Sequence, residues 1–248
     1  MKKFLFVIFF IFPLLAFSLS YDSIIHFKVD TTYLNQLPKW GNYFEHGKYK
    51  FKELQPSLHK QACDYLVPEL RKYPEDVIKQ FLNRFYIVSE IEEEGIGIGG
   101  FSDGPNKMIF LSFKDSLTDY NLYMFKRSVH HEMGHLLYYH NHKKFKYWKW
   151  VLNSKGKYLD YSDDGGFEAI KQGKTSKVYD PTLFQLGYVC QYGQSHYLED
   201  IATHCEILFL EPEVVKKYKQ YRRARNKLKA MMKYYKAINP HFSFENVF

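Results

Sequence analysis

The sequence predicts an α+β fold in which a small mixed sheet packs on one long helix and on a second, separate helix. Residues 86–91 and 108–113 are rich in β-branched and aromatic side chains, which is typical of strands. Residues 118–142 and 195–209 carry the patterns of two helices. No repeat or long linker divides the chain, so we expect residues 21–248 to form one domain.

Composition places the chain among globular proteins. Of its 248 residues, 46% are hydrophobic and 25% are charged, which excludes a disordered, collagenous or low-complexity fibre protein. The mean hydropathy of -0.42 excludes a polytopic membrane protein. Aromatic residues reach 19%, so the core is expected to contain many large flat side chains.

The N-terminal segment has the pattern of an export signal. Two lysines precede an uncharged run over residues 4–20, and small residues follow its most apolar part. This predicts a signal peptide over residues 1–20, cleaved after Ser18 or Ser20. An uncleaved anchor is the alternative, although the run is short for ~30 Å of hydrocarbon and Pro13 interrupts it. We therefore expect an exported protein, either secreted or periplasmic.

Three cysteines remain after the signal segment: Cys63, Cys190 and Cys205. An oxidising compartment permits one disulfide and one thiol among them, and their spacing leaves the pairing open. The sequence has no C-x-x-C pair, so it does not contain a thiolate zinc cluster.

The positive charge is concentrated near the C-terminus. The net charge is +8, but residues 212–238 alone hold ten basic residues and one acid, so the remaining mature chain is slightly acidic. This argues against a protein-wide nucleic-acid surface, and we expect no nucleic-acid partner. The segment is expected to form one packing helix with a charged outer face. Attachment of the stretch between Lys216 and Lys236 to an anionic membrane or another acidic partner is the alternative.

Further elements follow from local patterns. Residues 58–66 and 74–85 are expected to be helical, and residues 116–119 to form a capping box before the long helix. Residues 95–101 are expected to pair with 108–113 across a turn, and residues 21–47 to be irregular. The match of residues 95–100 to G-x-G-x-x-G follows three glutamates and leads to a turn, so we exclude dinucleotide binding. Its glycines instead predict close approach to another backbone.

The central motif is H-E-x-x-H at residues 131–135. Composition alone predicts roughly 0.03 such matches in a chain of this length. Residues four apart on a helix differ by about 40° in direction, so His131 and His135 can converge on one Zn²⁺ ion. Glu132 is rotated by about 100° and is placed to take a proton from water acidified by the ion.

Other polar clusters carry weaker signals. Three further histidines are expected to line a solvated helix end, and three aspartates to belong to a solvated loop rather than a calcium site. These residues are His130, His140, His142, Asp160, Asp163 and Asp164.

A catalytic zinc ion needs a third protein ligand. The metzincin pattern would place a glycine at 138 and a histidine at 141, where this chain has Tyr138 and Asn141. The helix at residues 195–209 offers Glu199 and Glu206 on one face, and periodicity allows either as ligand. Asp200 is turned away from that face by about 100°, and Cys205 is expected to point into the core.

Four segments together resemble the zinc-binding metallopeptidases of exported bacterial proteins, which are gluzincin-type zincins. The segments are residues 131–135, 165–166, 186–193 and 199–202. The spacing of the last two is also similar to that in the catalytic domain of anthrax lethal factor. The resemblance runs from about residue 66 to residue 209 and implies a zincin-like metallopeptidase domain.

The resemblance also implies roles for individual residues. Glu199 would be the third ligand of one zinc ion, and Tyr192, seven residues earlier, would stabilise the oxyanion, with Tyr197 as a nearby alternative. In such proteins the strand beside the active-site helix pairs with an extended peptide, a role we expect for residues 108–113. Thr203 stands where the family has a second glutamate, which puts ligand orientation and rate in doubt unless Glu206 compensates.

Together these features predict a secreted zinc metallopeptidase that hydrolyses peptide bonds of a peptide or protein substrate, with Glu132 as general base. Thr203 and the basic segment motivate an alternative. In that alternative the chain is a catalytically weak or inactive zincin-fold surface protein that binds anionic partners through its C-terminal helix. No motif defines the cleavage specificity or the oligomeric state.

Overall fold

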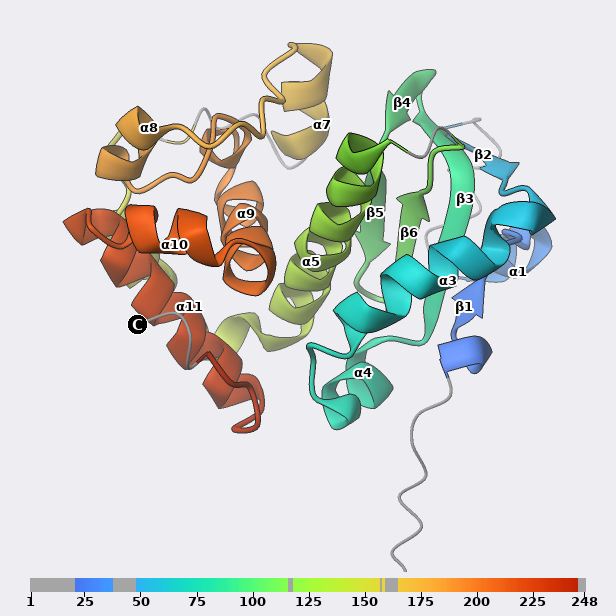
Figure 1. Ribbon diagram of the computed structural model, residues 1–248, viewed down its shortest axis with the longest axis horizontal. Coiled ribbons are helices and arrows are strands. Elements are labelled where there is room, and N and C mark those ends of the chain that lie inside the picture. Colours follow the sequence, from blue (N-terminus) through green and yellow to red (C-terminus); the bar gives the residue numbers. More distant parts are fainter. Residues whose placement is uncertain (1–20, 38–47, 116–117, 157, 159–164, 245–248) are drawn as a thin grey trace, which may run out of the picture.

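The computed structural model describes residues 21–37, 48–115, 118–156, 158 and 165–244 (Figure 1). The predicted signal peptide and the loop aspartates Asp160, Asp163 and Asp164 lie outside these residues. Within them, no helix combines the length and the apolar character needed to cross a bilayer. The fold is α+β, as predicted, with a mixed six-stranded sheet packed against helices.

The sheet is built around one long strand, β3 (Arg84–Glu93). On one side β3 pairs with β6 (Met108–Ser112) in parallel, and β6 pairs with β5 (Gly100–Asp103), which ends the sheet. The other pairings of β3 are with β1 (Ile25–His26), β2 (Tyr49–Glu53) and β4 (Ile96–Ile98).

Period-two alternation gives the sheet two buried faces. Alternate side chains of β3 and β6 join the main core beside α3 (Pro56–Leu70) and α5 (Asp119–Asn141): Phe85, Ile87, Ile109 and Leu111. The intervening side chains join a second core that includes Leu34: Tyr86, Val88, Met108 and Phe110. A sheet covered on both faces explains why residues 108–111 form a continuous apolar run.

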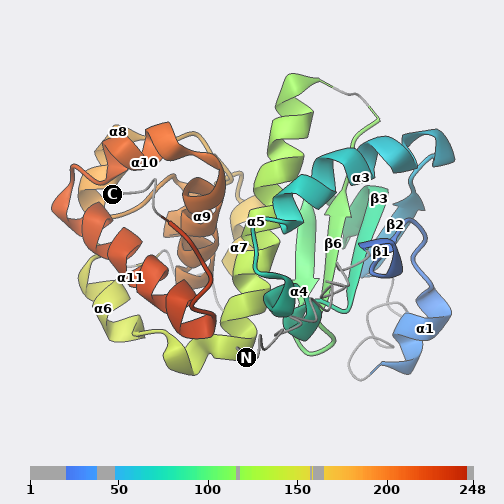
Figure 2. The ribbon, with the colours of Figure 1, turned by 60° about the horizontal axis from the view of Figure 1, so that its bottom comes forward.

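Helix α5 lies between the sheet and the C-terminal helices (Figures 1 and 2). Its N-cap is Thr118, whose Oγ1 accepts a hydrogen bond from the backbone N–H of Asn121 at 3.1 Å. The N-cap residue is therefore two positions after residue 116, where the predicted capping box begins. The remaining helices are η1 (Tyr21–Ser23), α1 (Thr31–Gln36), α4 (Glu75–Phe81), η2 (His142–Lys144), α6 (Tyr147–Leu152), α7 (Gly165–Lys171), α8 (Pro181–Leu186), η3 (Tyr192–Gln194), α9 (Tyr197–Leu210), α10 (Pro212–Tyr218) and α11 (Arg222–Ile238).

The predicted single C-terminal helix is in fact two helices, α10 and α11. The break lies between Tyr218 and Arg222, where Tyr221 takes an extended conformation. The rings of Tyr218 and Tyr221 pack against Phe184 of α8 at 5.0 and 6.1 Å. These two contacts hold the segment on both sides of the break against α8.

Three other local predictions were inaccurate. The segment 74–85 is helical only over α4, because its last residues enter β3. The segment predicted to be irregular contains β1 and α1, and β2 was not anticipated. Residues 108–113 form an internal strand between β3 and β5, so their backbone is already paired and β5 provides the edge instead.

Candidate metal centre

The candidate centre forms where α5 and α9 pack closely together. Gly134 makes this approach possible, because a Cβ at that position would lie 2.7 Å from Sγ of Cys205 and 3.4 Å from Cα of Ala202. Cys205 is fully buried, as predicted. Gly134 is one of the two unspecified positions of the H-E-x-x-H motif. Its small size therefore lets α9 approach the two histidines.

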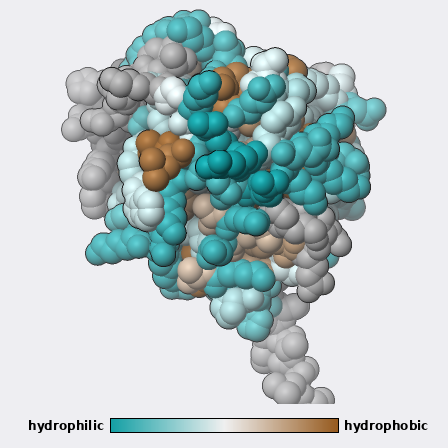
Figure 3. Space-filling view, turned by 90° about the vertical axis from the view of Figure 1, so that its left-hand side faces the viewer, coloured by the Kyte–Doolittle hydropathy of each residue, from teal (hydrophilic) through white to brown (hydrophobic). Residues whose placement is uncertain are grey.

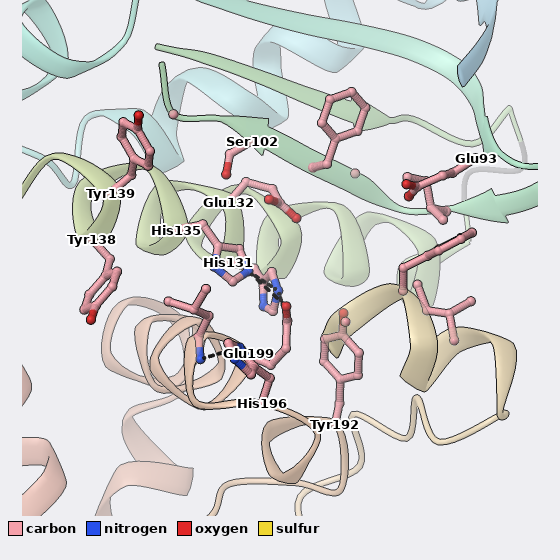
Figure 4. Close-up of a pocket in the computed structure, with 18 of the residues that line it drawn as sticks. Glu93, Ser102, His131, Glu132, His135, Tyr138, Tyr139, Tyr192, His196 and Glu199 are labelled. Atoms are coloured by element: carbon pink, nitrogen blue, oxygen red, sulfur yellow. Dashed lines mark hydrogen bonds and ion pairs between the residues drawn. The ribbon is translucent and has the colours of Figure 1, made fainter. Parts of the chain in front are cut away.

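Three side chains from these two helices converge at the cleft (Figure 4). Nε2 of His131 lies 3.0 Å from Oε2 of Glu199, and Nε2 of His135 lies 3.5 Å from Oε1 of the same carboxylate. The two Nε2 atoms are 3.2 Å apart. His131 and Glu199 are buried, and His135 is mostly buried.

These distances fit a single metal ion. Three donors that bind a tetrahedral ion at about 2.1 Å lie about 3.4 Å from one another. The sequence-based prediction of a His131, His135 and Glu199 group is therefore realised in the geometry, and the group can hold one ion. Asp200 points elsewhere, as its position on the helix predicted.

Glu206 lies behind the donor group and orients His131. Its Oε1 is 2.7 Å from Nδ1 of His131, so the opposite ring nitrogen faces Glu199 and His135. Arg127 donates to the other oxygen through Nε at 2.8 Å and through a terminal nitrogen, and Lys177 donates to Oε1 at 3.1 Å. Glu206 is thus an orienting carboxylate and not one of the three donors.

The charges around the site favour a cation at the donors. Burial alone would lower the pKa of His131, but hydrogen bonds to Glu199 and Glu206 raise it to about 9. Burial would raise the pKa of Glu206, but Lys177, Arg127 and His131 lower it. An imidazole between two carboxylates binds a positive charge, and a metal ion can replace the proton there.

Glu206 also resolves the departure at Thr203. The Thr203 hydroxyl donates to the backbone carbonyl of Asp200 at 3.0 Å, a hydrogen bond within α9 that does not involve a histidine. Positions 203 and 206 lie within about 60° of each other around the helix. The carboxylate that contacts His131 therefore comes from Glu206, on the face of α9 that the sequence had indicated.

His130 does not line a solvated helix end. It is fully buried, with Nδ1 2.8 Å from the Tyr73 hydroxyl and Nε2 2.9 Å from Oε2 of Glu69. Its ring stacks on Phe209 at 5.0 Å. Coverage by α3 and α9 could not be deduced from the position of His130 on α5. His142 is exposed, as expected, whereas His140 is partly covered and lies 5.6 Å from the ring of Phe81.

Glu132 points from α5 toward strand β5, beside Ser102 (Figure 4). It is buried, and burial raises the pKa of its carboxyl group against the opposing effect of the two histidines. A carboxylate with a raised pKa is a better proton acceptor near neutral pH than an exposed one. Its placement next to the donor group and outside it suits proton transfer.

Tyr192 lies on the other side of the donors, with its ring 5.8 Å from that of His131. Burial raises the pKa of its hydroxyl well above the ordinary value, and Glu199 adds to this effect. Gly166 makes room here, since a Cβ would lie 2.6 Å from Oε1 of Glu199 and 2.9 Å from the Tyr192 hydroxyl. Tyr197 contacts Tyr138 and Tyr147 instead, at ring distances of 6.1 and 4.9 Å.

A cleft of about 820 Å³ contains the donors and Glu132. One wall is the edge strand β5, represented by Gly100, Phe101 and Ser102, and α9 forms the opposite wall. Strand β5 ends the sheet at this wall, and its Gly100 packs tightly on Phe110 and Leu111 of β6. An extended chain can therefore lie along β5 and pass the donor group.

Sequence reasoning missed one buried network next to the centre. Lys227 of α11 is fully buried and lies 2.5 Å from Oδ2 of Asp200, the residue after Glu199. Trp150 and Tyr158 donate to the same oxygen at 2.8 and 2.7 Å. Lys227 belongs to a run of basic residues, so nothing in the sequence distinguishes it from the exposed cations around it.

The fold and the site together define an α+β protein with a buried His/His/Glu group that can hold one metal ion. Comparison with family models, with curated proteins and with solved structures finds no match to this chain.

Proposed function

We propose that this protein is an exported zinc-dependent metallopeptidase of the gluzincin type, with one zinc ion bound by His131, His135 and Glu199. The observation that carries the proposal is the mutual spacing of the three donors, between 3.0 and 3.5 Å, with a buried glutamate beside them. Two imidazoles and a carboxylate are ligands that zinc prefers in catalytic sites. The resemblance in sequence to zincins supports the same assignment.

The chemistry that zinc supplies in such a site is Lewis acidity, which acidifies water and polarises a peptide carbonyl. Glu132 accepts a proton from the water and delivers it to the departing amine. Tyr192 donates a hydrogen bond to the oxygen on which negative charge develops, and its raised pKa keeps that donor protonated. Strand β5 aligns the substrate by backbone hydrogen bonding.

The test is zinc content and proteolysis of the wild type and of Glu132→Gln. The wild type should bind one zinc ion per chain and cleave an unfolded protein substrate. Glu132→Gln should retain zinc and lose activity by about 10²–10⁴-fold. Glu213→Gln, an exposed glutamate on α10, is the matched control and should behave as wild type. A wild type without stoichiometric zinc, or a fully active Glu132→Gln protein, would refute the proposal.

Export remains part of the proposal through residues 1–20. N-terminal sequencing of the protein recovered from the producing cells should show a chain that begins after Ser18 or Ser20. A mature chain that still carries Met1 would contradict cleavage.

The alternative of a catalytically inactive surface protein rested on Thr203 and on the basic C-terminal segment. Because Glu206 supplies the orienting carboxylate, Thr203 no longer favours inactivity, whereas the basic segment remains compatible with both functions. Retained zinc without turnover of any member of a peptide library would restore the alternative.

A further inference from the structure

Helix α11 presents a stripe of cations on its outer face. Five exposed basic residues lie within an arc of about 80° over about 21 Å of helix: Arg222, Arg225, Lys229, Lys233 and Lys236. The helix contains no acidic residue. Its opposite face is buried and includes Leu228, Met231 and Tyr235, so the stripe points away from the core.

A short helix beside the stripe exposes large apolar side chains. Trp148 and Leu152 of α6 are 61% and 71% exposed. They are four residues apart and share the face opposite Trp150, which is fully buried. Lys149 lies over the Trp148 ring at 5.1 Å. Exposed tryptophan, leucine and lysine on one turn are unusual for a free aqueous surface.

The two features are neighbours. Nδ2 of Asn226, at the margin of the cationic stripe, donates to Oδ1 of Asn153 at the end of α6 across 2.9 Å. A Cβ on Gly187 would contact both Asn153 and Arg223, so α6 and the start of α11 meet there. Figure 2 shows α6 and α11 side by side, and Figure 3, which views the left-hand side of Figure 1, shows a largely hydrophilic surface there. The stripe and the apolar turn therefore form one face.

We propose that this α6–α11 face binds the surface of a bilayer that contains anionic phospholipids. The stripe supplies attraction to lipid phosphates, and Trp148 and Leu152 supply groups that enter the boundary between headgroups and acyl chains. Tryptophan prefers this boundary because its ring is apolar and its N–H is polar. A soluble polyanion would use the cations but would have no use for the exposed leucine, so the combination favours a membrane.

The face also borders one end of the cleft. Tyr147, the first residue of α6, packs edge-on against Tyr197 at 4.9 Å, and Tyr197 lines the cleft. Attachment through α6 and α11 would hold that end of the cleft near the lipid surface. The binding itself does not depend on the proposed zinc chemistry, and the two proposals can fail separately.

The experiment is co-sedimentation of residues 21–248 with phosphatidylcholine vesicles, prepared with or without phosphatidylglycerol. The wild type should bind only the anionic vesicles, and added salt should weaken binding. Arg222→Gln/Arg225→Gln/Lys233→Gln should weaken it by about 100-fold, since each basic residue contributes about fivefold. The charge-matched control Lys50→Gln/Lys60→Gln/Lys79→Gln removes exposed cations outside this face and should bind as wild type.

A second variant tests the apolar part. Trp148→Ser/Leu152→Ser should weaken vesicle binding by at least tenfold, because two large side chains no longer leave water. Both variants should retain the thermal unfolding transition of the wild type, since the changed side chains are exposed. Equal binding by the stripe variant and its control would overturn the proposal. So would binding to a DNA duplex that is tighter than vesicle binding and insensitive to the Trp148 and Leu152 changes.

Discussion

Oε1 of Glu206 and Nδ1 of His131 are 2.7 Å apart, and this hydrogen bond determines which nitrogen of His131 faces the donor group. Because the pKa of Glu206 is lowered, the carboxylate is the acceptor and the ring N–H the donor. A carboxylate–histidine pair of this kind fixes the ring orientation and increases the basicity of the opposite nitrogen.

Replacing Glu206 should impair both metal binding and stability. Glu206→Gln should weaken zinc binding by about 10–100-fold, as measured by competition with a chromogenic chelator. It should also lower the free energy of unfolding by about 3–5 kcal/mol, because Arg127 would remain buried without its anion. The exposed Glu213→Gln is the control for both measurements. Wild-type zinc affinity in Glu206→Gln would show that the carboxylate does not orient His131.

Gly134 should tolerate no side chain. Gly134→Ala places a Cβ 2.7 Å from Sγ of Cys205, and overpacking of this kind costs about 1–3 kcal/mol of unfolding free energy. Urea denaturation should show that loss, and zinc affinity should fall with it because α9 carries Glu199. Cys205→Ala in the same chain should recover part of the loss. Gly97→Ala, where nothing lies within 4 Å, is the control. Equal stability of the two alanine variants would contradict the close helix contact.

Loss of the Tyr192 hydroxyl should lower turnover far more than loss of the Tyr197 hydroxyl. Tyr192→Phe removes the hydroxyl beside the donors and should lower kcat by about 10²–10³-fold, with zinc content unchanged. Tyr197→Phe is the control, since its ring packs on Tyr138 and Tyr147 at the other end of the cleft. Steady-state kinetics on one peptide substrate decides the matter. The reverse order of effects would assign the oxyanion role to Tyr197.

Lys227 should be essential for stability although it lies far along a basic helix. Lys227→Met leaves Asp200 buried without its cation and should lower the free energy of unfolding by about 3–5 kcal/mol. Asp200→Asn in the same chain should recover part of that loss, because the unpaired charge is then absent. Lys233→Met, on the exposed face, should change stability by less than about 0.5 kcal/mol. Thermal and urea unfolding both measure these differences.

The sequence predicted the donors on α5 because four-residue spacing fixes the relative direction of two imidazoles whatever surrounds them. The sequence did not distinguish Glu199 from Glu206 as the third donor, since both lie on one face of α9. Which of them reaches the donor group depends on how far α5 is displaced along the axis of α9. The resemblance to zincins selected Glu199, and the geometry agrees. Spacing within one helix is local, whereas the alignment of two helices is a tertiary property.

Burial of polar residues was the least predictable feature. His130 and Lys227 are both fully buried, yet each sits among polar or basic neighbours in the sequence. Their burial depends on partners distant in the chain, Glu69 and Asp200. The division of the C-terminal segment into two helices was not predicted either, and at the break Tyr218 and Tyr221 pack against Phe184, which is distant in the chain.

The direct contact of α5 with α9 at Gly134 has a consequence for how the protein acquires its ion. Because the backbones of α5 and α9 pack directly together, they fix the distance between the histidines on α5 and Glu199 on α9. A core of this size remains folded through its own apolar contacts. The chain should therefore fold before it binds the metal ion, at a site that is already formed. Small zinc domains differ, because they fold only when zinc binds.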